Sequence, residues 1–103
     1  MGRKVTLCRT DQLKPGQGAQ VEVEGRMIAV FNVDGQYYAI GGECTHQGGP
    51  LGEGELDDTR VTCPWHGSQF DVASGEVLGP PAMENVPSYP VVVEDDEVKV
   101  ELA

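Results

Sequence analysis

Short runs of apolar residues, separated by turn-forming residues, follow one another along most of the chain. Residues 19–24 alternate small or apolar with polar side chains, a pattern typical of a half-buried strand. Residues 27–33 are almost continuously apolar, which predicts a strand buried on both faces. Asp34-Gly35 then favours a two-residue hairpin turn with positive φ at both positions, and residues 36–40 form the return strand. This part of the chain is therefore predicted to be a β-hairpin whose first strand is buried.

Further short strands are predicted on both sides of this hairpin. They cover residues 5–8, 60–62, 69–72, 89–94 and 97–102. In the last of them Val98, Val100 and Leu102 would face one way, and Asp95-Asp96 would form the turn that precedes it. No segment has sustained helical periodicity. We therefore predict an all-β fold in which small antiparallel sheets form a sandwich or barrel.

One long stretch departs from this pattern. Residues 41–58 contain six glycines, one proline and five acidic residues, with little periodicity. A loop of this length inside a compact domain is usually functional, and it must be fixed by something other than its own apolar packing. We expect a single domain over residues 1–103, with a loop-rich insertion over approximately residues 41–82.

Composition and charge narrow the classes of function. The chain has 103 residues and a formal net charge of −10, which argues against nucleic acid as a partner because phosphates would be repelled. The acidic surface would either steer docking or only aid solubility. No apolar run approaches the ~20 residues that span a bilayer, and no apolar stretch follows the charged start as it would in a signal peptide. We expect a cytoplasmic protein that does not bind membranes.

Two short motifs hold the candidate chemistry: Cys44-Thr45-His46 and Cys63-Pro64-Trp65-His66. Sixteen residues separate them, and they contain both histidines of the chain and two of its three cysteines. The third cysteine, Cys8, lies in a predicted strand and is expected to be a small core residue. Each motif offers one thiol and one imidazole, so the sequence predicts a metal site with Cys44, His46, Cys63 and His66 as ligands.

Two kinds of metal centre fit two thiolates and two imidazoles. One is a tetrahedral Zn²⁺ site, and the other is a [2Fe–2S] cluster in which two histidines replace two cysteines on one iron. In the common zinc arrangement a cysteine pair precedes a histidine pair on a helix. Here each motif brings one ligand of each type and no helix is predicted, which favours the cluster.

The motif C-x-H, sixteen residues, then C-x-x-H followed by Gly67-Ser68 resembles the Rieske iron–sulfur family, and the resemblance covers the whole chain. It implies one [2Fe–2S] cluster, with two cysteines on one iron and two histidines on the other. It also implies that the insertion is the cluster-binding subdomain, and Gly79-Pro80-Pro81 is similar to the proline loop that covers the cluster in that family. On this resemblance, six residues form the environment of the cluster: Gln47, Trp65, Ser68, Phe70, Pro80 and Pro81.

Three positions depart from the membrane-anchored, cytochrome bc-type members of the family. Gly49 and Trp65 stand where those proteins have two cysteines that form a disulfide between the cluster loops. Phe70 stands where they have a tyrosine that donates a hydrogen bond to a cysteine sulfur, although Ser68 remains as a hydroxyl donor. Fewer donors leave the added electron less stabilised, so we expect a potential near the lower end of the Rieske range of roughly −150 to +300 mV.

The chain is similar to the small Rieske ferredoxins of multicomponent ring-hydroxylating dioxygenases. That similarity implies a monomeric one-electron carrier that receives electrons from a flavoprotein reductase, passes them to a terminal oxygenase, docks near its histidine ligands and has no catalytic site of its own. Two alternatives remain open. One is the small Rieske subunit of a larger redox enzyme such as a nitrite reductase, and the other is a zinc-stabilised β interaction module.

Overall fold

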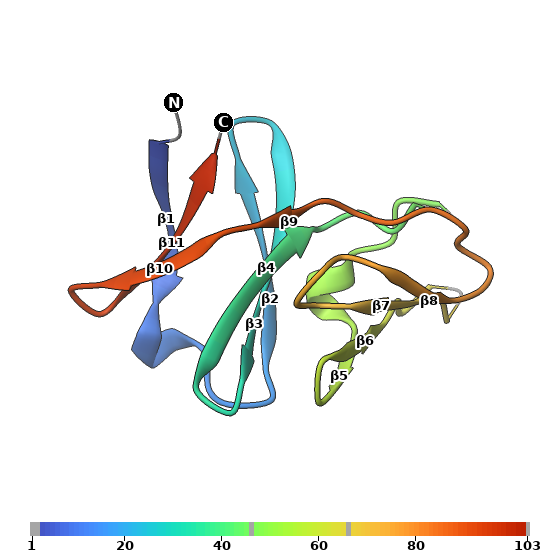
Figure 1. Cartoon of the computed structure of the whole chain (residues 1–103), viewed down its shortest axis with the longest axis horizontal. Helices are drawn as coiled ribbons and strands as arrows, with labels where there is room; N and C mark the ends of the chain where they lie inside the picture. Colours follow the sequence, from blue (N-terminus) through green and yellow to red (C-terminus); the bar gives the residue numbers. More distant parts are fainter. Residues whose placement is uncertain (1–2, 46, 66, 103) are drawn as a thin grey trace.

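The computed structural model describes residues 3–45, 47–65 and 67–102. Within these residues every strand belongs to one of three small antiparallel sheets, and the two helical segments are short 3-10 turns, η1 (Thr10–Gln12) and η2 (Leu51–Glu53) (Figure 1). The predicted all-β class is therefore confirmed. None of the helical segments in the described ranges is long and apolar enough to cross a bilayer.

The first sheet joins the two ends of the chain. Its strand order is β1 (Arg3–Arg9), β11 (Glu97–Leu102) and β10 (Val91–Glu94). Val98, Val100 and Leu102 are all buried, as their alternation predicted. Asp95 and Asp96 both have positive φ and connect β10 to β11.

The second sheet is built around the predicted hairpin. Its strand order is β2 (Gly18–Val23), β3 (Arg26–Val33), β4 (Gln36–Gly41) and β9 (Ser88–Tyr89). The turn between β3 and β4 has φ of 52° at Asp34 and 91° at Gly35, which confirms the two-residue hairpin. The interior of β3 is buried on both faces, because two different apolar cores lie on either side of it.

The third sheet lies within residues 41–82. Its strand order is β5 (Glu55–Asp57), β6 (Arg60–Thr62), β7 (Gln69–Asp71) and β8 (Val77–Gly79). The strands β6 and β7 were predicted. The expectation that residues 55–57 are loop was wrong and β8 was not foreseen. Glu55-Leu56-Asp57 stands in a stretch rich in glycine and charge, and Val77-Leu78-Gly79 runs directly into two prolines, so pairing to neighbouring strands defines both.

The expected strand over residues 89–94 was also wrong in part, because it is two strands that belong to different sheets. The strand β9 pairs with β4, whereas β10 pairs with β11. Pro90 separates them, since its nitrogen carries no hydrogen to donate to a ladder. Its carbonyl oxygen still accepts a hydrogen bond from the Glu101 N–H at 3.0 Å.

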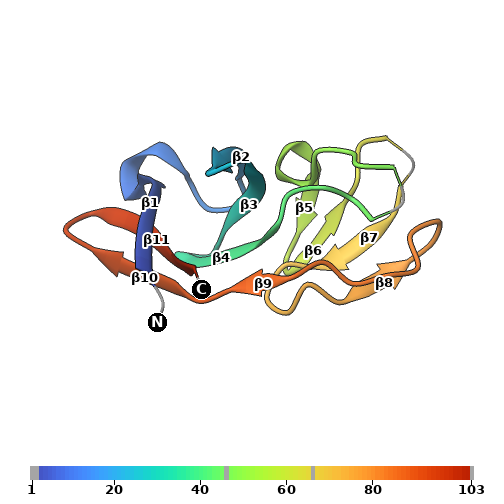
Figure 2. The same ribbon diagram turned by 90° about the horizontal axis from the view of Figure 1, so that it is seen from above.

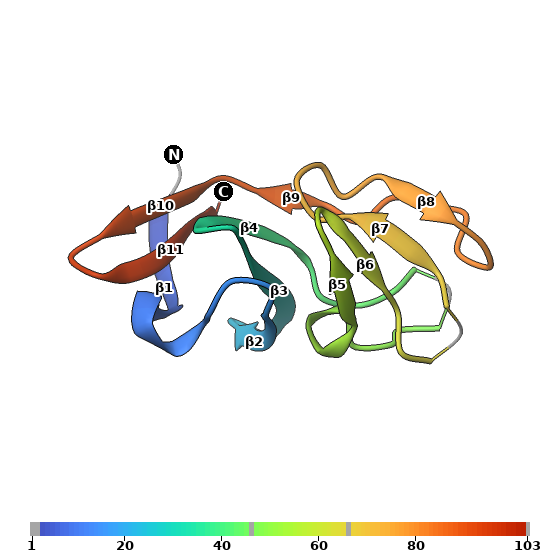
Figure 3. The same cartoon turned by 90° about the horizontal axis from the view of Figure 1, so that it is seen from below.

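Two apolar cores hold the three sheets together. The first core lies between the first and second sheets, and the second core joins the second sheet to the third sheet and its loops. In β3, Ile28 and Val30 belong to the first core, and Ala29 and Phe31 belong to the second. The molecule measures 38 × 29 × 18 Å, and Figures 2 and 3 show the three sheets following one another along its length.

The ends of the chain lie far from the loops of the third sheet. Arg3 pairs with Leu102 in the first sheet. Figure 2 shows both termini on the side of the first sheet, while the green and yellow loops next to β6 and β7 reach the opposite end. The motif-bearing part of the chain is therefore at one end of the molecule and the termini are towards the other.

Candidate metal centre

The first motif lies in a loop closed by two backbone hydrogen bonds. The Cys44 N–H donates to the Gly49 carbonyl at 2.9 Å, and the Gly48 N–H donates back to the Cys44 carbonyl at 2.7 Å. Gly48 has a φ of +77°, a conformation that a residue without Cβ adopts at little cost. The backbone turns sharply after the cysteine and returns five residues later.

The second motif repeats this arrangement. The Cys63 N–H donates to the Ser68 carbonyl at 2.7 Å, and the Gly67 N–H donates to the Cys63 carbonyl at 3.1 Å. Gly67 has a φ of +82° and corresponds to Gly48 of the first loop. The two loops therefore have the same backbone plan, with a cysteine at the start and a glycine four residues later.

The structure brings the two cysteine side chains into one apolar region. Cys44 and Cys63 are 4% and 2% exposed, form no disulfide and belong to the second core. The loops also touch, because a Cβ added to Gly49 would lie 2.6 Å from the Cys63 Sγ and 3.1 Å from the Trp65 ring. Two free thiols buried together among apolar side chains fit the cysteine half of an iron–sulfur site.

The two histidine ligands predicted from the sequence, His46 and His66, lie outside the described residues. Across residues 3–45, 47–65 and 67–102, no three or more His, Cys, Asp or Glu side chains are grouped so as to hold a metal ion. The two cysteines are thus the part of the predicted ligand set that the described chain contains.

A third segment, residues 80–84, is hydrogen-bonded to both loops. The Ala82 N–H donates to the Ser68 Oγ at 2.9 Å, and the Thr45 Oγ1 donates to the Glu84 carbonyl at 2.7 Å. Pro80 and Pro81 are exposed and lie just before these contacts. The segment predicted to cover the cluster is therefore held next to the first and second loops by one hydrogen bond each.

Ser68 is fully buried, and its hydroxyl accepts the hydrogen bond from Ala82. A hydroxyl has one hydrogen of its own, which leaves Ser68 able to donate to an acceptor inside the site. Thr45 was not singled out from the sequence, because its partner Glu84 is 39 residues away.

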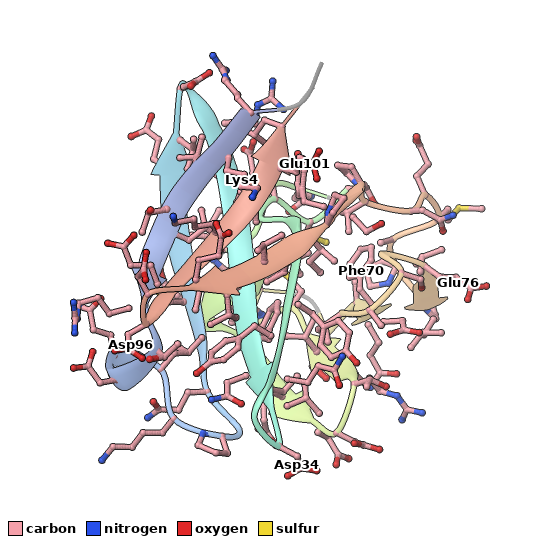
Figure 4. The ribbon with its side chains drawn as sticks, turned by 60° about the vertical axis from the view of Figure 1, so that its left-hand side comes forward. Lys4, Asp34, Phe70, Glu76, Asp96 and Glu101 are labelled. Carbon is pink, nitrogen blue, oxygen red and sulfur yellow. The ribbon has the colours of Figure 1, made fainter. Side chains whose placement is uncertain are left out.

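The other residues predicted near the cluster fall into two groups. Phe70 is fully buried in the same core as Cys44 and Cys63, and its ring offers no hydrogen-bond donor. Figure 4 shows it inside the part of the molecule that contains the third sheet, whereas Glu76 points outwards. Gln47 and Trp65 are exposed, and Trp65 retains 56% of its accessible surface.

The remaining cysteine belongs to a different part of the molecule. Cys8 lies on β1 and is half-buried against the first core, so it packs on the edge of that core and is not the buried core residue that was expected. Burial raises the pKa of its thiol above the ordinary value. We expect iodoacetamide to alkylate Cys8 more slowly at pH 8 than it alkylates free cysteine, because the thiolate is the reacting form.

Mass spectrometry of the labelled protein measures this rate, and the unfolded chain in guanidinium is the control. Labelling of folded Cys8 as fast as free cysteine would contradict the expectation.

A comparison with protein families finds one family that matches most of the chain. The model of the family described as "Rieske [2Fe-2S] domain" matches residues 3–90. The chain belongs to the Rieske family. The resemblance to the Rieske family that the sequence indicated is therefore confirmed. Because the family is described by its [2Fe–2S] domain, membership supports a [2Fe–2S] cluster.

One relative matches along nearly its whole length. The biphenyl dioxygenase ferredoxin subunit of Pseudomonas sp. (strain KKS102) is 37% identical, over 93% of this chain and 89% of the relative. The resemblance to ferredoxin components of dioxygenases is thus confirmed.

Two solved structures give the same fold. One chain in a complex of reduced oxygenase and oxidised ferredoxin of carbazole 1,9a-dioxygenase superposes with a TM-score of 0.88 at 33% identity, over 94% of this chain and 91% of that chain. A protein from Mycobacterium tuberculosis described as the small subunit of an NADH-dependent nitrite reductase superposes with a TM-score of 0.88 at 27% identity, over 100% and 97%.

Proposed function

We propose that the protein holds one [2Fe–2S] cluster, with Cys44 and Cys63 on one iron and His46 and His66 on the other. Residues 41–82 would be its cluster-binding subdomain. The observation that carries this proposal is the pair of equivalent loops, each of which starts from a buried free cysteine and contains one histidine in its sequence. The cluster supplies reversible one-electron chemistry when it is bound.

The residues of this chain would shape that chemistry. The second core excludes water from the cysteine side of the site, and Ser68 offers its hydroxyl hydrogen there. Pro80 and Pro81 would shield the site from one side, supported by the Ser68–Ala82 and Thr45–Glu84 hydrogen bonds. Gln47 and Trp65 would lie on the outer surface of the loops.

We further propose that the protein is a one-electron carrier between a flavoprotein reductase and a terminal Rieske non-haem-iron oxygenase, and not an enzyme by itself. Its match to a dioxygenase ferredoxin subunit over 93% of one chain and 89% of the other supports this role. A monomer that docks through the loop end, near His46 and His66, would give its partners a short route to the cluster.

Purification with iron and spectroscopy test the cluster. We expect a red-brown protein with equal amounts of iron and acid-labile sulfide, and a rhombic EPR signal on reduction. A colourless protein that contains zinc would overturn the proposal in favour of the zinc-stabilised module.

Reconstitution tests the partners. We expect the protein to support substrate oxidation by a biphenyl-type oxygenase when a flavoprotein reductase and NADH are present. The similarity to a nitrite reductase small subunit favours a second candidate, a subunit of such an enzyme. Stable co-purification with a nitrite reductase large subunit, without electron transfer to any oxygenase, would favour that candidate.

A third experiment measures how Phe70 affects the potential. We expect Phe70→Tyr to raise the midpoint potential by roughly 40 mV. One added hydrogen bond is worth about 1 kcal/mol, and a tenfold change in the equilibrium constant corresponds to 59 mV for a one-electron couple. Redox titration followed by circular dichroism measures the shift. Phe31→Tyr, in the same core but on β3, is the control, and an equal shift in both variants would contradict a specific effect at position 70.

A further inference from the structure

The two cysteine loops have the same backbone arrangement at their tips but different pairing at their bases. Below the second loop, β6 and β7 form a regular ladder in which Thr62 pairs with Gln69. Below the first loop there is one isolated bridge, between Glu43 and Pro50. One further backbone hydrogen bond, from the Leu51 N–H to the Gly42 carbonyl at 2.9 Å, closes its base. The Gly42 N–H also donates to the Met27 carbonyl of β3 at 2.8 Å, but the two flanks of the first loop have less backbone pairing with each other than those of the second loop.

A side chain from β2, two strands away from β4 in the second sheet, spans the base of the first loop. Gln20 lies on β2, and its Nε2 donates to the Gly42 carbonyl at 2.6 Å. The Gly52 N–H donates to the Gln20 Oε1 at 2.7 Å. One carboxamide thus binds the residue where the loop leaves β4 and the residue where it enters η2.

The carboxamide sits between two glycine backbones that leave it little freedom. A Cβ added to Gly42 would lie 2.7 Å from the Gln20 Nε2, and one added to Gly52 would lie 2.5 Å from the Gln20 Oε1. Gln20 is itself half-buried, although the alternation of residues 19–24 suggested a solvent-facing position. Its neighbour Val21 packs on the opposite face of β2, against the first core.

We propose that Gln20 is a positioning residue for the cluster. Its carboxamide takes the place of the β-ladder that the first loop lacks, and so fixes the segment that contains Cys44 and His46 relative to the second loop. This inference rests on the proposed cluster and its ligands. It predicts that losing the amide loosens one ligand loop while the three sheets stay intact.

The experiment compares Gln20→Met with Val21→Ala in the iron-loaded protein. Gln20→Met keeps the length of the side chain and removes both hydrogen bonds, and Val21→Ala removes core packing from the same strand without touching the loop. We expect Gln20→Met to release iron to a chelator roughly tenfold faster than the unmodified protein, from the loss of two hydrogen bonds. We also expect its reduced EPR signal to be broadened or shifted, and that of Val21→Ala to be unchanged.

Two further variants complete the comparison. Gln69→Met removes a half-buried amide at the base of the second loop, where the ladder remains, and we expect little change in iron release. Gln20→Glu keeps the acceptor for the Gly52 N–H but has no donor for Gly42, and we expect faster iron release as well. Gln20→Glu replaces Gln20→Met in the comparison if Gln20→Met does not fold.

The outcomes separate the inference from the proposed function. If Gln20 variants release iron no faster than Val21→Ala at matched thermal stability, with an unaltered EPR signal, the positioning role is overturned. If the unmodified protein itself binds no iron–sulfur cluster, the proposed function fails instead, and that result is seen before any variant is made.

Discussion

Replacement of Cys63 by serine is expected to leave the protein without an iron–sulfur cluster. Cys63 is 2% exposed at the start of the second loop, and a serine hydroxyl has far less affinity for iron than a thiolate does. The visible absorption of the oxidised protein and the EPR signal of the reduced protein should both disappear. Cys44→Ser is expected to have the same effect, because each loop would supply one of the two thiolate ligands that we propose.

The matched control is Cys8→Ser. Cys8 lies on β1 against the first core, away from both loops, so this variant should keep a full complement of iron and its EPR signal. Circular dichroism in the far ultraviolet establishes that each variant is folded. A Cys63→Ser protein with undiminished iron and an unchanged EPR signal would refute the ligand assignment.

Substitution of Gly49 by alanine is expected to have the second largest effect. The new Cβ would lie 2.6 Å from the Cys63 Sγ and 3.1 Å from the Trp65 ring, so the two loops would have to separate. Overpacking of this kind costs about 1–3 kcal/mol in a folded core. Because a sulfur bound to iron cannot move aside, we expect most of the protein to be made without cluster, as measured by iron content per chain.

Gly48→Ala is the control for this prediction, because it changes the adjacent residue of the same loop. A Cβ there would meet only the end of the Glu43 side chain, at 3.9 Å. Its cost comes from the positive φ and is about 1 kcal/mol. Equal iron content in the two variants would show that contact with Cys63 is not what limits position 49.

The regular strands could be predicted from the sequence because their burial is periodic. The strand β3 has a different core on each face, and its apolar run is continuous because both faces are buried. The strands β5 and β8 could not be predicted, since β5 lies in a segment rich in glycine and charge and β8 runs directly into two prolines. Neighbouring strands define them, and a single sequence does not reveal those neighbours.

That Cys44 and Cys63 come together could also be predicted, because spacing and residue type are local properties. The hydrogen bonds that hold the site together could not. Gln20 reaches Gly42 and Gly52, and Thr45 reaches Glu84, across separations of 22, 32 and 39 residues. A glutamine in an alternating strand has the same local pattern whether it faces water or the base of a loop.

The pairing of Arg3 with Leu102 has a practical consequence for assembling this protein into devices and fusions. A linker attached at either terminus leaves the molecule on the side of the first sheet, while the cysteine loops occupy the other end (Figure 1). A chain tethered to an electrode through its terminus would therefore keep its loop end turned to solution. The same tether would hold the cysteine loops away from the electrode, so direct electronic contact with a cluster bound there would be slow and delivery to a soluble acceptor would be unhindered.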